Sequence, residues 1–143
     1  MSAPRKPVAE QLPPAPELPK GAVIERQGYS PFPIVGVGAS AGGLEALTQL
    51  LSQIPADCGM AFLVVQHLDP RHESRLTELL GRSAPLPVSE PAHGEAVRPN
   101  HVYVIPPNTN MALARGVLLL SPRGEAHGPH LPIDYLFRSL AED

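Results

Sequence analysis

A glycine-rich segment at residues 36–43, which reads GVGASAGG, constrains the fold of this chain more than any other stretch. The apolar run at residues 34–37 leads into it and is typical of a strand that is covered on both faces. Leucines at helical spacing follow from Leu44 to Leu51, and Pro55 is expected to end that helix. The chain must therefore turn sharply from a buried strand into a helix, and glycines permit the close backbone approach that such a turn needs.

The order of strand and helix repeats further along the chain. A second continuous apolar strand is expected at residues 60–65, and a second helix is expected to begin at Asp69-Pro70 and to carry Leu80 on its apolar face. Shorter strands are expected at residues 86–88 and 101–105, a hairpin at 111–114 and 117–120 around Arg115-Gly116, and an amphipathic helix after Pro132. Alternating strands and helices imply parallel strands with right-handed crossovers. We therefore predict an α/β fold with a doubly wound, mostly parallel sheet and a small antiparallel hairpin.

Proline content divides the chain into two parts. The 143 residues include 19 prolines, well above the usual share of about 5%, and many of them fall near the start. Residues 1–31 show no apolar period, so they cannot bury enough side chain to offset the ordering of their backbone. We expect residues 1–31 to be a Pro-rich, disordered tail or linker and residues 32–143 to hold the folded domain.

Net charge, cysteine content and hydropathy exclude several classes of protein. A formal net charge of −3 argues against binding to nucleic acid, which usually requires a basic stripe. Cys58 is the single cysteine, so neither a disulfide framework nor a four-thiolate zinc site can form. No apolar run reaches the roughly 18 residues of a membrane span, and the start of the chain lacks a signal-peptide core. We expect a cytoplasmic protein without membrane insertion.

Ser40 lies at the centre of the glycine-rich turn, and its neighbours fit a nucleophile elbow. In the pattern Gly38-x-Ser40-x-Gly42, the turn would lift the serine hydroxyl above the carboxyl end of the sheet. The helix would begin directly after the serine, and its first N–H groups could bind a developing oxyanion. The turn and oxyanion residues in this hypothesis are Gly38, Ala41, Gly42 and Gly43.

His67 directly follows the second expected strand. Neighbouring parallel strands end at the same edge of a sheet, so His67 should lie beside Ser40. A histidine there could accept the serine proton and later return it to a leaving alcohol. A metal site is a weaker interpretation, because the spacing of the nearby ligand-type residues matches no known motif, and we expect no metal. Those residues are His67, Asp69, His72 and Glu73.

The same turn also partly fits a dinucleotide-binding fingerprint, in the pattern Gly36-x-Gly38-x-x-Ala41. That fingerprint requires an acidic residue about 20 positions later, at the end of the second strand, to bind the ribose. Here the second strand ends at Gln66, and Asp69 lies beyond it, so the fingerprint is incomplete. A nucleotide-binding α/β module remains an alternative to a serine hydrolase.

Four ordered blocks of sequence resemble the CheB-type chemotaxis methylesterase domain. They are residues 34–46 (IVGVGASAGGLEA), 64–68 (VVQHL), 94–107 (GEAVRPNHVYVIPP) and 131–139 (LPIDYLFRS). Together they span nearly the whole chain from Phe32 onward, so the resemblance is specific. The segment HLDPRHESRL at residues 67–76 is most similar to proteins in which this domain is fused to a CheR-type methyltransferase.

This resemblance implies a serine hydrolase that removes methyl esters from glutamate side chains of chemoreceptors and in some members also deamidates glutamine. Ser40 falls on the family's nucleophile and His67 on its general base. The partner would be the methylated cytoplasmic domain of a chemoreceptor or a related signalling protein, with a CheR-type methyltransferase as a partner or fused segment. No cofactor is implied.

Three departures from the family pattern qualify that implication. The family's catalytic aspartate lies in a Gly-x-Asp-Gly motif after a further strand, which this chain does not reach, and Asp134 belongs to a different block. Stand-alone members often carry threonine directly after the serine, where this chain has Ala41. They also carry an N-terminal receiver domain, where this chain has residues 1–31. We therefore expect an incomplete, N-terminal portion of the domain with weak or absent activity. A catalytically dead interaction domain is a further alternative.

Overall fold

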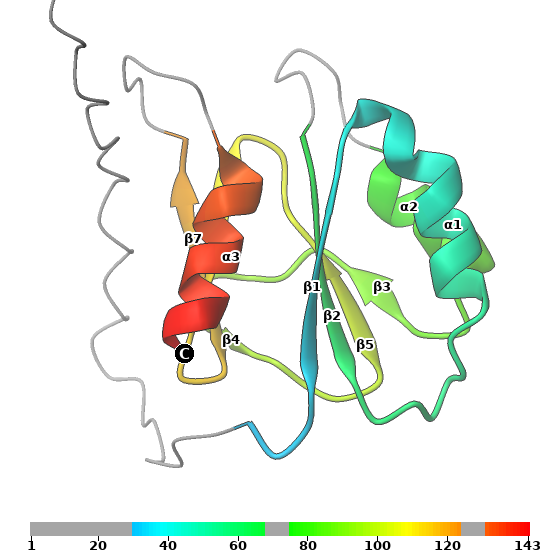
Figure 1. Ribbon diagram of the computed structural model, residues 1–143, viewed down its shortest axis with the longest axis horizontal. Helices are drawn as coiled ribbons and strands as arrows, with labels where there is room; N and C mark the ends of the chain where they lie inside the picture. Colours follow the sequence, from blue (N-terminus) through cyan, green and yellow to red (C-terminus); the bar gives the residue numbers. More distant parts are fainter. Residues whose placement is uncertain (1–29, 68–74, 124–130) are drawn as a thin grey trace, which may run out of the picture.

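The computed structural model describes residues 30–67, 75–123 and 131–143, which form two sheets and their covering helices (Figure 1). A parallel sheet has the strand order β1-β2-β5-β3. Its strands are β1 (Ile34–Ala39), β2 (Ala61–Gln66), β5 (His101–Val104) and β3 (Val88–Ser89). An antiparallel sheet has the order β4-β7-β6, with β4 (Glu95–Ala96), β7 (Val117–Pro122) and β6 (Thr109–Ala114).

Helices follow the strands in the predicted order. A 3₁₀ turn, η1 (Ala41–Gly43), and helix α1 (Leu44–Ser52) connect β1 to β2. Helix α2 (Leu76–Ser83) precedes β3, and α3 (Pro132–Glu142) carries the expected proline in its first turn. The expected start of the second helix, at Asp69-Pro70, lies outside the described residues. The predicted α/β fold with a mostly parallel sheet is confirmed.

The antiparallel part is larger than the hairpin that the sequence predicts. Strands β6 and β7 do form that hairpin, and Arg115 (φ 51°) and Gly116 (φ 71°) both adopt the positive φ that a type I′ turn requires. A third strand, β4, joins them because Glu95 pairs with Leu118. Pairing between segments this far apart leaves no local signal in the sequence, so the prediction of a hairpin alone is incomplete.

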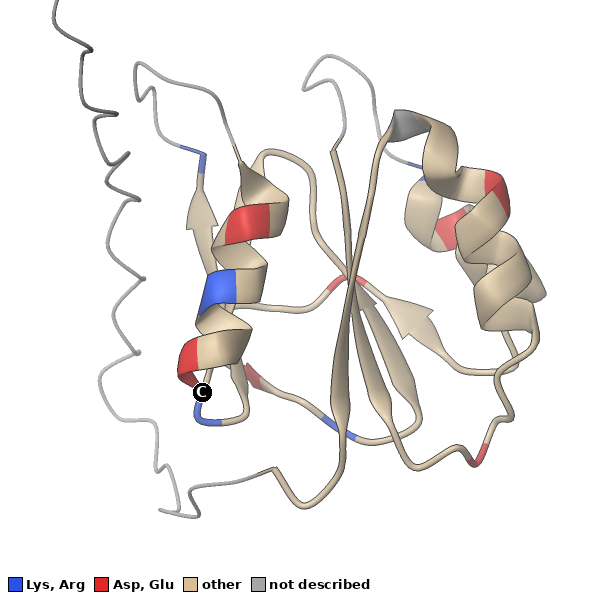
Figure 2. Ribbon diagram, in the orientation of Figure 1, with Lys and Arg blue, Asp and Glu red and all other residues tan. Residues whose placement is uncertain are grey.

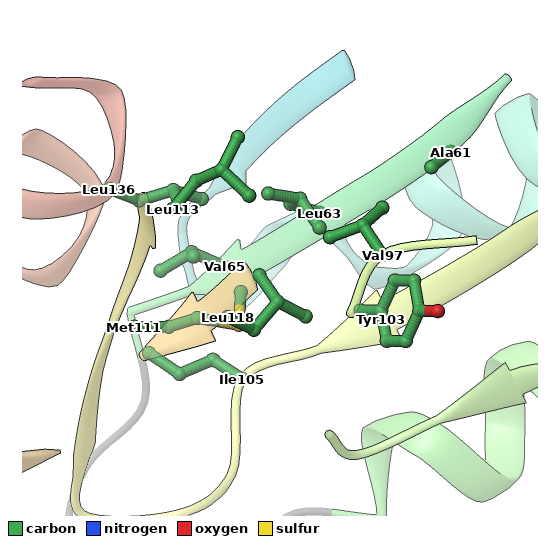
Figure 3. Packing of buried hydrophobic residues seen from close by; sticks show 10 residues of the cluster. All are labelled: Ala61, Leu63, Val65, Val97, Tyr103, Ile105, Met111, Leu113, Leu118 and Leu136. Atoms are coloured by element: carbon green, nitrogen blue, oxygen red, sulfur yellow. The ribbon is translucent and has the colours of Figure 1, made fainter. Parts of the chain in front are cut away.

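Strand β2 lies inside the parallel sheet and is buried along its whole length. Its side chains alternate between two cores, as the two-residue period of a strand requires. The core under α1 and α2 contains Leu47, Leu51, Phe62, Val64, Leu76, Leu80, Leu86, Val102 and Val104. The core toward the antiparallel sheet and α3 contains Ala61, Leu63, Val65, Val97, Tyr103, Ile105, Met111, Leu113, Leu118 and Leu136 (Figure 3). Burial on both faces explains why the sequence of β2 is a continuous apolar run.

Helix α3 packs closely against the glycines of β1. A Cβ atom at Gly36 would lie 2.6 Å from Leu140 Cδ1, and one at Gly38 would lie 2.6 Å from Ile133 Cγ2. Both distances are far below a normal contact, so a side chain at either position would require Leu140 or Ile133 of α3 to shift. Gly38, which the sequence pattern predicts to be part of the oxyanion turn, lies within β1 and beside α3.

We expect Gly38→Ala to lower the free energy of unfolding by about 1–3 kcal/mol, because the added Cβ would push Ile133 of α3 away from β1. Urea unfolding followed by circular dichroism would measure this loss. Gly42→Ala is the matched control, since no heavy atom lies within 4 Å of a Cβ at Gly42. Equal destabilisation of the two variants would contradict the proposed packing role of Gly38.

Candidate active site

Ser40 and His67 lie at the same edge of the parallel sheet, directly after the last residues of β1 and β2. Those last residues, Ala39 and Gln66, are register partners. The His67 N–H donates a hydrogen bond to the Ala39 carbonyl at 2.9 Å, and both Ser40 and His67 are exposed. The parallel pairing of β1 and β2 therefore makes a hydroxyl-bearing residue and an imidazole-bearing residue neighbours along this edge.

Ser40 precedes η1 with an extended backbone (φ −76°, ψ 171°). Its side chain forms no capping hydrogen bond, so the hydroxyl is not engaged by the turn that it precedes. The Ser40 carbonyl instead accepts the Gly43 N–H at 2.9 Å, which closes the turn. The chain thus enters η1 without positive φ at Ser40, unlike the strained turn of a nucleophile elbow.

The three residues after Ser40 differ in whether their backbone N–H groups are available to bind an oxyanion. Gly43 donates its N–H to Ser40, and a Cβ at Gly43 would lie 2.8 Å from the Ala39 Cβ, so Gly43 closes the turn and is not a free oxyanion donor. Gly42 is exposed and faces open space. Ala41 begins η1, and the first N–H groups of a helical turn have no acceptor within it. Ala41 and Gly42 are therefore the better candidates to bind an oxyanion.

Gln66 contacts the serine turn, although its place in the sequence indicates only the end of a strand. Its side chain is buried (4% exposed), and its Nε2 donates a hydrogen bond to the Ser40 carbonyl at 3.0 Å. The four parallel strands carry no Lys, Arg, Asp or Glu (Figure 2), so a buried polar side chain at the end of β2 is conspicuous. The available signal in the sequence is a glutamine that ends an apolar run directly before His67.

The placement of the fingerprint glycines disfavours the nucleotide-binding alternative. In a dinucleotide site, glycines in the turn itself allow the phosphates to approach the backbone. Here Gly36 and Gly38 lie within β1, and the space beside them is filled by Leu140 and Ile133 of α3. The glycine pattern is thus explained by helix packing and by a sharp turn.

The described part of the chain contains neither a candidate metal cluster nor a membrane-spanning helix. Within residues 30–67, 75–123 and 131–143, no three His, Cys, Asp or Glu side chains gather closely enough to hold a metal ion. Asp69, His72 and Glu73, which the metal hypothesis includes, lie outside these residues. In the same ranges, no helix is long and apolar enough to cross a membrane. Asp134, which belongs to the fourth sequence block, lies in the first turn of α3.

A second serine–histidine pair, Ser89 and His101, joins β3 to β5. The Ser89 Oγ and His101 Nε2 atoms lie 2.7 Å apart, and the His101 and Tyr103 ring centroids are separated by 4.3 Å. The described residues that directly follow Ser89 form no helix, so no helix N-terminus is present there to bind an oxyanion. This pair has the hydrogen bond of a hydrolase dyad without its anion-binding turn, and we assign it a structural role.

We expect His101 to make the stability of the fold depend on pH. Burial, and next the positive charge of Arg98, lower the pKa of His101 from its ordinary value of 6.5, while Glu95 opposes this shift. The unfolded chain therefore binds this proton at a higher pH than the folded chain, so stability falls as the pH drops below about 6.5. Urea unfolding between about pH 7.5 and about pH 5 should show the loss. His101→Gln should reduce the pH dependence, and an unchanged dependence would contradict this assignment.

Comparison with known proteins identifies the family. The CheB methylesterase family matches residues 35–143. The chain belongs to this family. A curated relative from Syntrophus aciditrophicus, protein-glutamate methylesterase/protein-glutamine glutaminase 1, is 36% identical over 137 residues, which are 95% of this chain and 38% of the relative. A protein-glutamate methylesterase/protein-glutamine glutaminase from Nitrosospira multiformis is 37% identical over 113 residues, which are 78% of this chain and 32% of the relative.

A solved structure agrees with this assignment to the CheB methylesterase family. The catalytic domain of the Thermotoga maritima CheB methylesterase is similar with a TM-score of 0.67 and 26% sequence identity, over 78% of this chain and 61% of that chain. The resemblance carried by the four sequence blocks is therefore confirmed. The chain spans only about a third of the length of its curated CheB relatives, 38% of one and 32% of the other.

Proposed function

We propose that this chain carries the serine and histidine of a protein-glutamate methylesterase site and hydrolyses carboxylic esters. The observation that carries the proposal is the pairing of β1 with β2, which makes Ser40 and His67 neighbours at one edge of the sheet. The Ser40 hydroxyl forms no capping bond, and both residues are exposed, so a substrate carbonyl could reach them. Ser40 is the proposed nucleophile and His67 the proposed general base.

The proposed reaction follows from the chemistry of these side chains. His67 accepts the Ser40 proton as the Ser40 Oγ attacks the ester carbonyl carbon, and the N–H groups of Ala41 and Gly42 bind the oxyanion that forms. The bond between the carbonyl carbon and the methoxy oxygen then breaks, and methanol leaves with the proton from His67. Water attacks the acyl-enzyme, gives a proton to His67 and releases the glutamate carboxylate, and His67 returns that proton to Ser40.

The proposed substrate is a methyl ester on a glutamate side chain in the cytoplasmic domain of a chemoreceptor or a related signalling protein. Its support is the name of the relatives, which are protein-glutamate methylesterases and protein-glutamine glutaminases. A glutamine side chain would form the same acyl-enzyme with loss of ammonia, so we include deamidation. Such a substrate implies a cytoplasmic location and a CheR-type methyltransferase as partner or fused segment. The reaction uses no cofactor, metal or nucleic acid.

The rate of the proposed reaction depends on whether an acidic residue orients His67. We propose that residues 1–31 are a tail or linker and that residues 32–143 are part of a methylesterase domain. A serine hydrolase also uses an acid to orient its histidine, and the family's Gly-x-Asp-Gly motif does not occur in this sequence. Loss of the aspartate from a triad lowers kcat on the order of 10⁴-fold. We therefore expect slow catalysis from these 143 residues when they are purified alone.

Methanol release from a methylated cytoplasmic fragment of a chemoreceptor tests this function. The purified chain should release methanol at a rate roughly 10⁴-fold below that of a methylesterase with a complete triad. A Ser40→Ala variant should release none above the spontaneous rate. Equal release from the wild-type and Ser40→Ala chains would instead favour a catalytically inactive interaction domain, and release at the rate of a complete methylesterase would contradict the expected weakness.

A further inference from the structure

Gln66 holds a polar side chain inside an otherwise apolar part of the fold. It is the last residue of β2, directly before His67, and only 4% of it is exposed. Burial of an amide costs free energy unless the amide is hydrogen-bonded. Its Nε2 donates to the Ser40 carbonyl oxygen at 3.0 Å, across 26 positions in the sequence. The buried Gln66 amide is thus hydrogen-bonded to the backbone of the proposed nucleophile, so Gln66 is part of the candidate site.

The Ser40 carbonyl accepts two hydrogen bonds, and they come from different parts of the fold. The Gly43 N–H, at 2.9 Å, belongs to the same short turn as Ser40 and moves with it. Gln66 belongs to β2, which pairs with strands on both sides. Of these two donors, Gln66 is the one that ties the peptide after Ser40 to β2. Ala39 and Gln66 are the last register pair of β1 and β2. The side-chain bond of Gln66 therefore links β2 to Ser40, one residue beyond the end of β1.

Fixing the Ser40 carbonyl also fixes the N–H of the next residue. The peptide unit is planar and trans, so its C=O and N–H point in opposite directions. The N–H opposite the Ser40 carbonyl is that of Ala41. The Ala41 N–H is one of the two donors that the proposed function assigns to the oxyanion.

We propose that Gln66 is a positioning residue that sets the orientation of the Ser40–Ala41 peptide, and through it the Ala41 N–H that binds the oxyanion. This inference rests on the proposed function of Ser40 as a nucleophile. Without the Gln66 amide, the peptide keeps the bond within its own turn but loses its bond to β2, so it rotates more freely about the flanking single bonds. The Ala41 N–H then spends less time in the direction that the transition state requires.

Gln66→Met tests this role, because methionine has a similar length and fits buried sites but has no N–H donor. Loss of an oxyanion donor lowers catalytic rates by about 10²–10³-fold. A donor that is only misaligned should cost less, so we expect the maximal rate at which a fluorophosphonate labels Ser40 to fall by about 10- to 100-fold. The probe concentration for half-maximal rate should stay unchanged, because the peptide orientation matters in the transition state. Gln66→Leu provides a second donor-free variant if Gln66→Met is poorly folded.

Val102→Ala is the matched control for lost stability, because Val102 is fully buried in β5 and contacts the core under α1 and α2. It should be destabilised and still be labelled at the wild-type maximal rate. A wild-type maximal rate in a folded Gln66→Met chain would overturn the inference. A similar loss of rate in Val102→Ala would also overturn it, because the effect would then follow stability rather than the amide.

Amide NMR of the same three proteins separates this inference from the proposed function. The Ala41 and Gly43 amide resonances should shift in Gln66→Met and stay in place in Val102→Ala, whether or not the chain reacts with the probe. Unmoved Ala41 and Gly43 resonances in Gln66→Met would overturn the inference alone. A wild-type chain that is not labelled, with resonances that shift as expected, would overturn the proposed nucleophile and with it the catalytic purpose of Gln66.

Discussion

His67→Ala is expected to slow the labelling of Ser40 by a fluorophosphonate by roughly 10²- to 10⁴-fold, which is the usual contribution of a general base. During labelling, the bond between the Ser40 Oγ and phosphorus forms, the P–F bond breaks, and His67 takes the serine proton. His67 is exposed and follows β2, so removal of its ring leaves the two cores intact. Labelling rates read by gel fluorescence, with an unfolding curve for each protein, would measure the effect.

His93→Ala is the matched control for loss of an imidazole. His93 is exposed, and its Nδ1 accepts the Leu120 N–H at 3.0 Å in the antiparallel sheet rather than at the edge formed by β1 and β2. This variant should be labelled at the wild-type rate. Equal labelling of the wild-type and His67→Ala chains would remove His67 from the proposed mechanism.

Local patterns in the sequence predict much of this fold. Apolar runs predict β1 and β2, and the leucine period predicts α1, because burial and side-chain spacing are properties of short segments. The Arg115-Gly116 turn and the proline at the start of α3 are predicted from backbone preferences in the same way. The parallel order of strand and helix then predicts that Ser40 and His67 share a sheet edge, which the pairing of β1 and β2 agrees with.

Contacts between distant segments are what the sequence does not reveal. Strand β4 joins the hairpin through Glu95 and Leu118, and neither residue has a local pattern that indicates the other. In the sequence, the glycines of β1 fit a catalytic turn and, in part, a phosphate-binding turn, whereas their closeness to α3 gives Gly36 and Gly38 a packing role. The Gln66 bond to Ser40 spans 26 positions and depends on the register of two strands, so it becomes visible only in the structure.

Ser40→Ala is expected to abolish labelling by the fluorophosphonate and to leave the stability of the fold nearly unchanged. The hydroxyl is the group that would attack the probe, so no phosphonyl-enzyme can form at this position without it. Ser40 is exposed and its side chain forms no capping bond, so the free energy of unfolding should stay within about 0.5 kcal/mol of the wild-type value. Ser89→Ala is the matched control, because Ser89 is the serine that lies 2.7 Å from a histidine nitrogen elsewhere in the fold.

Mapping the labelled residue in the wild-type chain by mass spectrometry of its peptides tests whether Ser40 is the nucleophile. We expect the probe on Ser40, loss of labelling in Ser40→Ala and undiminished labelling in Ser89→Ala. A probe found on Ser89, or labelling that persists in Ser40→Ala, would contradict this expectation.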